Sequence, residues 1–175
     1  DWNEDRLKRN LKVPNDQRLH VIWTYLKNKG ATQKSINEVC NITDFHAFFI
    51  ERIAKLVRLE IEVEKCKKTI PDKLLTELKR NGFGDKHISH LTQINQREIR
   101  EQRKKLGIIS SFLMVDTCAG EFEAKTPYFY STYADDKEPI KTGKSIVILG
   151  SGPIRIGQGI EFDYSTVHGV QAARD

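Results

Sequence analysis

The sequence predicts a mainly α fold, in which a compact helical connection domain is followed by an extended connector and the first β-loop-α unit of a truncated α/β domain. Apolar residues recur at helical spacing through the first two-thirds of the chain, and β-branched and aromatic residues cluster after Gly107. The late stretch SIVILGSGPIRIGQG is typical of a buried strand that enters a glycine loop. We expect the helical domain at residues 1–107, the connector at 108–143 and the α/β fragment at 144–175.

The first helices are predicted to be short. A polar helix covers Asp5–Leu11, and Asn15 and Asp16 then provide N-cap candidates for the next helix, which ends at Gly30. The apolar side chains of that second helix are Leu19, Ile22, Trp23 and Leu26. Thr32 is an N-cap candidate for a short turn that follows.

The longest helix is predicted over residues 44–65, with Thr43 as its N-cap. Its apolar stripe is wider than the ~100° of an ordinary amphipathic helix, so we expect a central helix that packs on more than one side. The stripe contains Phe45, Phe48, Phe49, Ile50, Ile53, Leu56 and Val57. We interpret its aromatic residues as core rather than as a cofactor site.

Three short helices with tight turns follow. The first begins near Pro71 and ends before Gly82. Asp85 is the N-cap candidate of the second helix. Asn95 begins the third helix, which Gly107 closes.

Extended structure is predicted beyond this point. Residues 108–115 and 128–133 read as strands, and residues 134–143 form a polar linker. Residues 145–149 then form a strand, and residues 162–174 the first turns of a helix. A strand as apolar as SIVIL needs sheet neighbours on both sides, so we expect the chain to be a piece of a larger protein.

Composition predicts a soluble, cytoplasmic protein. Charged residues make up 30% of the chain, and no window approaches the ~18 consecutive apolar residues of a membrane helix. The charged N-terminus does not resemble a signal peptide. The three scattered cysteines, Cys40, Cys66 and Cys118, favour neither a disulfide framework nor a zinc site.

Positive charge is concentrated between Lys67 and Lys105, where eleven Lys or Arg stand against five Asp or Glu. The short basic helices there resemble a helix-turn-helix DNA reader, so a nucleic-acid-binding module is one alternative. Glu98 and Glu101 lie beside the basic residues and pair with them along one helix, which favours a solvated helical face. We therefore expect no nucleic-acid partner.

The glycine loop contains Gly150, Gly152, Gly157 and Gly159. Its spacing departs from the GxGxxG dinucleotide fingerprint, and the full GxxxxGK[ST] pattern of a P-loop is absent, because Gly143-Lys144-Ser145 comes before the strand and has Glu138 where the first glycine would stand. A small nucleotide-binding domain remains a second alternative.

Other polar residues indicate no catalytic or metal site. His87 and His90 share a helix face but have no third ligand nearby in the sequence. Asp116, Glu121 and Glu123 stand among aromatic residues in VDTCAGEFEAKTPYFYSTY, where they form either a specific interface or a covered linker.

That string, followed by VILGSGPIRIGQGIEFDYSTVHG, resembles the large subunit of carbamoyl-phosphate synthetase. Three upstream strings are similar to the connection or oligomerization domain of this family: FHAFFIERIAKLVRLE, LLTELKRNGFGD and INQREIREQRKKLGI. The resemblance covers essentially the whole chain.

The resemblance implies a parent ligase with two homologous ATP-grasp halves, joined by an all-helical domain and supplied with ammonia by a glutaminase small subunit. The parent would use ATP with Mg or Mn, and K, to make carbamoyl phosphate for pyrimidine and arginine synthesis. The residues that hold ATP would lie outside this segment, so we expect it to bind no cofactor and to be inactive alone.

The resemblance also assigns site residues. Arg155, Gly159 and Glu161 would line or brace the carbamate tunnel, with the glycine leaving room where a Cβ would intrude. The alternative is a loop that only packs against the ATP-grasp unit. For self-association, the candidate surfaces are the N-terminal helix, Glu4–Leu11, and the outer helical faces.

Overall fold

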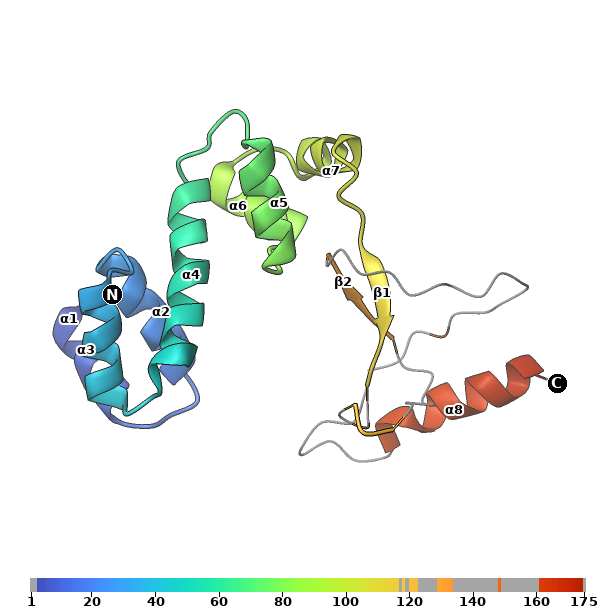
Figure 1. Cartoon of the computed structure of the whole chain (residues 1–175), viewed down its shortest axis with the longest axis horizontal. Coiled ribbons are helices and arrows are strands. Elements are labelled where there is room, and N and C mark those ends of the chain that lie inside the picture. The colour runs from blue at the N-terminus through green and yellow to red at the C-terminus, as the bar shows by residue number, and fades with distance from the viewer. Residues whose placement is uncertain are drawn as a thin grey trace. The chain divides into compact units, whose positions relative to one another are not determined.

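The computed structural model describes residues 3–116, 118, 120–122, 129–133, 148 and 161–174 (Figure 1). The chain is 63% helical, and its described part holds eight helices and a two-stranded sheet, which confirms the mainly α prediction. By internal contacts the chain divides into two units, Asp1–Ile108 and Ile109–Asp175. No helix among the described residues combines the length and the apolar character needed to cross a membrane.

The described residues of the first unit form seven helices: α1 (Glu4–Lys12), α2 (Arg18–Asn28), α3 (Gln33–Thr43), α4 (Ala47–Val63), α5 (Asp72–Arg80), α6 (Asp85–Thr92) and α7 (Gln96–Lys105). Helix α4 is central, as its wide apolar stripe predicts. Helices α2 and α3 pack on it, and so do α5 and α6 (Figure 1). Two apolar cores therefore share one helix.

The first core lies between α1, α2, α3 and the beginning of α4. Its buried residues are Leu7, Leu11, Val21, Ile22, Tyr25, Leu26, Ala31, Ile36, Val39, Ile50, Ala54 and Val57.

The prediction that the side chain of Asn15 or Asp16 caps α2 is wrong. Gln17 occupies that position without a side-chain cap bond, and Asn15 Oδ1 instead accepts from the Gln17 amide at 2.9 Å. Leu19, expected inside, is 60% exposed.

Helix α3 follows the prediction more closely. The Thr32 side chain caps it by accepting a hydrogen bond from the Ser35 amide. The helix runs to Thr43, so the predicted short turn is a full helix of 11 residues.

The second core lies between the end of α4 and helices α5, α6 and α7. Its residues are Leu59, Val63, Ile70, Leu74, Leu75, Leu78, Phe83, Ile88, Ile94 and Ile99. Gly82 and Gly107 follow α5 and α7 with φ of 87° and 69°, a conformation that glycine adopts without strain. Asn95 caps α7 by accepting from the Arg97 amide at 2.8 Å. The prediction that Asp85 caps α6 is wrong, because Gly84 is the N-cap and Asp85 is the first helical residue.

The described part of the second unit contains β1 (Ser111–Met114), β2 (Phe129–Thr132) and α8 (Glu161–Arg174). The two strands pair antiparallel, with Ser111 opposite Thr132 and Met114 opposite Phe129. Both strands lie within the segments that β-branched and aromatic patterning predicts, and the final helix lies where the sequence predicts the helix that follows the glycine loop. The strand expected over residues 145–149 and the linker over 134–143 lie outside the described residues, apart from position 148.

Candidate functional site

Three phenylalanines lie exposed at the beginning of α4, and we call them the aromatic patch: Phe45, Phe48 and Phe49, with exposed fractions of 42%, 48% and 61%. The sequence prediction that they belong to the core is wrong. Helix α4 buries Ile50, Ala54 and Val57 instead. At about 100° per residue, Phe48 points some 200° away from Ile50 on the helix. Phe45 precedes the helix altogether.

The turn before α4 is also built differently from the prediction. Thr43 was expected to cap the long helix, but it is the last residue of α3. The His46 side chain caps α4, with its Nδ1 accepting from the Phe48 amide at 3.3 Å. Thr43 Oγ1 accepts from the Phe45 amide at 3.3 Å and donates to the Val39 carbonyl at 2.7 Å. These bonds tie the backbone beneath the aromatic patch to α3.

Two arginines cover parts of the phenyl rings. The Arg18 guanidinium lies 4.9 Å from the Phe45 ring centre, and the Arg52 guanidinium lies 4.9 Å from that of Phe48. Phe48 and Phe49 meet edge to face with ring centres 5.4 Å apart. Arg18 also donates to two backbone carbonyls, those of Leu11 and Thr43, at 2.9 and 3.1 Å. Such contacts hold the rings in place without burying them.

Helix α1, one of the predicted association surfaces, has a charged outer face. Its Leu7 and Leu11 side chains face the first core and are at most 1% exposed. On the outside, Glu4 bridges Lys8 at 2.9 Å and Lys29, the C-cap residue of α2, at 3.0 Å. The aromatic patch is the more apolar of the two surfaces.

A buried ionic cluster joins α5, α6 and α7. Asp85 accepts from Lys79 Nζ at 2.7 Å and from Arg103 Nε at 2.8 Å, and the Lys79 side chain is only 3% exposed. Burial alone would raise the pKa of Asp85, but the bonds from Lys79 and Arg103 outweigh it and lower the pKa. Two cations of the basic block therefore serve this cluster, which weakens the nucleic-acid alternative.

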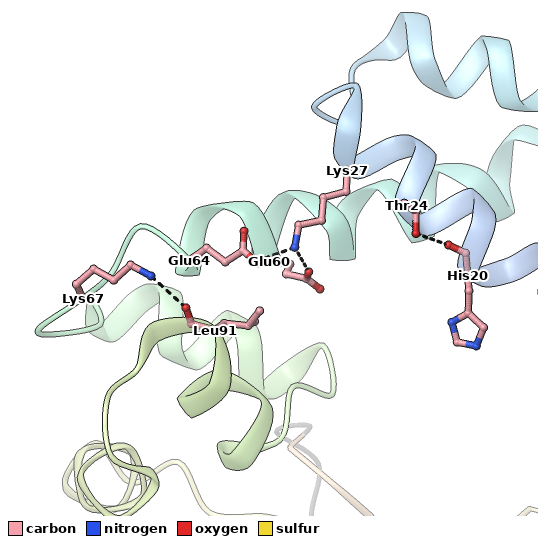
Figure 2. Close-up of polar contacts among 7 residues, drawn as sticks. All are labelled: His20, Thr24, Lys27, Glu60, Glu64, Lys67 and Leu91. Carbon is pink, nitrogen blue, oxygen red and sulfur yellow. Dashed lines mark hydrogen bonds and ion pairs between the residues drawn. The ribbon is translucent and has the colours of Figure 1, made fainter. Parts of the chain in front are cut away.

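A second cluster joins α2 to the C-terminal end of α4. Figure 2 shows Lys27 with its Nζ between Glu60 and Glu64. The Glu60 side chain is 8% exposed, and the Lys27–Glu64 distance is 2.7 Å. Burial lowers the pKa of Lys27, but hydrogen bonds to the two carboxylates outweigh that effect and raise it. Sequence analysis missed this pair, although a glutamate on the apolar side of a helix is a usable signal.

Among the histidines and acidic residues singled out above, His87, His90, Asp116 and Glu121 are exposed. His87 stacks on Phe83 with ring centres 5.5 Å apart. Asp116 Oδ1 accepts from the Cys118 amide at 2.9 Å, and Glu121 is exposed. Glu123 lies outside the described residues. Within the described part of the chain, no three His, Cys, Asp or Glu side chains are grouped to hold a metal ion.

The predicted tunnel and glycine-loop positions fall outside the described residues. They are Arg155, Gly159, Gly150, Gly152 and Gly157. Glu161 is the first residue of α8, but its side chain is outside the described part as well. The tunnel assignment and the nucleotide-binding alternative both stay predictions.

Comparisons with known proteins cover both ends of the chain. Residues 1–107 match the family model described as "Carbamoyl-phosphate synthetase large chain, oligomerisation domain". Residues 142–175 match the model described as "Carbamoyl phosphate synthase preATP-grasp domain".

Three curated relatives, each named carbamoyl phosphate synthase large chain, come from Methanosarcina mazei, Methanosarcina barkeri and Methanothrix thermoacetophila. They are 48%, 47% and 43% identical to this chain. Each alignment covers 99% of the chain and 16% of the relative, so the chain spans about a sixth of the relatives' length. The family model of the oligomerisation domain alone covers more than half of the chain. The chain therefore belongs to the family of carbamoyl phosphate synthase large chains.

Proposed function

We propose that this chain is the structural and self-association segment of a carbamoyl-phosphate synthetase large subunit. One observation carries the proposal. The residues that match the oligomerisation domain, 1–107, coincide with a helical unit that buries two apolar cores of its own along α4. A unit of this kind holds its shape through internal packing and can present a fixed outer surface.

In the parent, the segment would connect two synthetase halves. The parent ligase would make carbamoyl phosphate from bicarbonate, glutamine-derived ammonia and two ATP, for pyrimidine and arginine synthesis in the cytoplasm. Its partners would be the remainder of the large subunit and a glutaminase small subunit. ATP, with Mg or Mn and K, would bind in the parent outside this segment, while Arg155, Gly159 and Glu161 would line the carbamate tunnel.

Self-association is tested by size-exclusion chromatography with light scattering on the 175-residue chain. Across a series from about 1 to 500 µM, a range that brackets the affinities of weak and transient protein pairs, we expect the weight-average mass to rise from the monomer mass of 20.2 kDa. A mass that stays at the monomer value over the whole series would refute the proposal.

Inactivity of the isolated segment is tested separately. ATP hydrolysis with bicarbonate should not exceed a no-protein blank, because phosphoryl transfer depends on charges positioned around the phosphates and the metal ions. Turnover that scales with protein concentration, and that survives a second purification step, would contradict this part of the proposal.

A further inference from the structure

We propose that the aromatic patch, Phe45, Phe48 and Phe49, is the surface through which two copies of this chain pair. The inference rests on the self-association proposed above and names the surface that carries it. The patch belongs to residues 1–107, the part that matches an oligomerisation domain, and it lies at the beginning of the helix that both cores share. We take its partner to be the same patch on a second copy, because the charges around it are self-complementary, as described below.

The exposed area is the first argument. A phenylalanine side chain offers on the order of 200 Å². With exposed fractions of 42%, 48% and 61%, the three rings present roughly 300 Å² of apolar surface within five residues. That is the size of the largest apolar patch on a typical monomer, and about a third of what one partner contributes to a standard interface.

In the described part of the first unit, other exposed apolar side chains do not form such a group. Among the described residues of the first unit, the remaining large ones are Val13, Leu19 and Leu106, aliphatic side chains from three different segments. Single exposed aliphatic residues are ordinary on protein surfaces. Aromatic rings with neighbouring arginines are the composition that interface centres favour.

Charge around the patch favours an identical partner. Arg18 and Arg52 lie over the rings, and Asp44 and Glu51 are exposed beside them in the sequence. Two cations and two anions make a formally neutral rim, which suits neither a strongly acidic nor a strongly basic partner. In a two-fold pair each surface meets itself, so Arg52 of one copy can face Glu51 of the other.

The patch is also held in position before any partner binds. The His46 cap, the Thr43 bonds and the two arginine contacts fix the backbone and the rings. A surface whose side chains are already ordered loses less conformational entropy on association. Pairing through it therefore needs less additional apolar contact.

The test compares Phe49→Ala with Phe122→Ala in the 175-residue chain by sedimentation equilibrium. Phe49 is 61% exposed and Phe122 is 75% exposed, so neither change removes core packing, and Phe122 lies outside the patch. We expect Phe49→Ala to weaken the dimerisation constant at least tenfold, as for a residue at an interface centre. Phe122→Ala should leave it within about twofold of the wild type.

A charge exchange provides the second arm. Arg52→Glu should weaken pairing, and the double variant Arg52→Glu/Glu51→Arg should restore most of it, because the exchanged charges meet again across the two-fold axis. Far-UV circular dichroism and thermal melting establish that each variant is folded.

The outcomes separate the two proposals. A wild-type chain that stays monomeric overturns the self-association itself. A wild-type chain that dimerises, together with a folded Phe49→Ala variant that dimerises equally well, overturns only the assignment to the patch.

Discussion

Asp85 is a position where a single isosteric substitution should greatly reduce the stability of this chain. The substitution Asp85→Asn keeps the size and shape of the side chain and removes its charge. It removes the carboxylate that binds Lys79 and Arg103, whose side chains are 3% and 15% exposed. The perturbation therefore acts on the charge balance of the cluster that joins α5, α6 and α7.

The magnitude follows from this burial. Breaking a buried ion pair by removing one partner costs about 3–5 kcal/mol, because a charge stays desolvated and uncompensated. Lys79 Nζ keeps its bond to the Phe83 carbonyl at 2.7 Å, and Arg103 keeps one to the Ile108 carbonyl at 3.1 Å. These remaining acceptors place the expected loss near the lower end, at about 3 kcal/mol.

Urea unfolding followed by circular dichroism measures the effect. Glu101→Gln is the matched control, since it removes one carboxylate from an exposed position on α7. We expect the control to change the free energy of unfolding by no more than about 0.5 kcal/mol. If Asp85→Asn costs no more than Glu101→Gln, the buried cluster does not stabilise the packing of the last three helices, and the reasoning fails.

The same carboxylate predicts a pH dependence. The pKa of Asp85 is lower in the folded chain than its ordinary value of 3.8. A group with a lowered native pKa contributes stability above its unfolded pKa and loses it as the pH falls toward the native value. The difference in unfolding free energy between wild type and Asp85→Asn should therefore be constant near pH 7 and shrink below about pH 4.

Two further substitutions test individual contacts within the helical unit. Tyr25 is buried and donates to Glu38 at 2.8 Å, and burial, followed by that bond, raises its pKa to about 12. Tyr25→Phe should cost about 1.5 kcal/mol in urea unfolding at pH 7. That difference should vanish as the pH rises from about 10 toward 12, because the stability from a raised native pKa is complete below the unfolded pKa and is lost as the pH rises through the native one. An unchanged difference at pH 12 would contradict the assigned bond. Gln93 ends α6 with φ of 65°, so Gln93→Gly should stabilise by about 1 kcal/mol and raise the melting temperature by roughly 3 °C. A lower melting temperature would show that the Gln93 bond to the His90 carbonyl matters more than backbone strain.

The local parts of the fold were predictable from the sequence because they depend on short-range chemistry. Thr32 and Asn95 cap their helices as expected, since a side-chain oxygen next to free amides needs no distant partner. Gly82 and Gly107 follow the ends of α5 and α7 as expected, because a left-handed backbone conformation favours glycine. Strands β1 and β2 likewise follow the β-branched and aromatic pattern.

The predictions that proved wrong concern which face of a helix is buried and which residues bind one another. The predicted apolar stripe of the long helix was too wide to show which of its residues are buried. Packing against α2 and α3 places Ile50 and Ala54 inside, while Phe48 and Phe49 stay exposed. Asp85 was expected to serve its own helix end. It binds cations from α5 and α7 instead, which no local pattern reveals.

The sequence by itself determined most of the helical segments, though not the full length of α3, and the family to which the chain belongs, because each depends on residues close together or on long matching strings. The tertiary structure decided which helix faces are buried, how Lys27 and Glu60 meet across α2 and α4, and which rings remain exposed at the start of α4. The physical reason is that burial and ion pairing join side chains from separate helices, so their outcome depends on packing rather than on spacing along one segment.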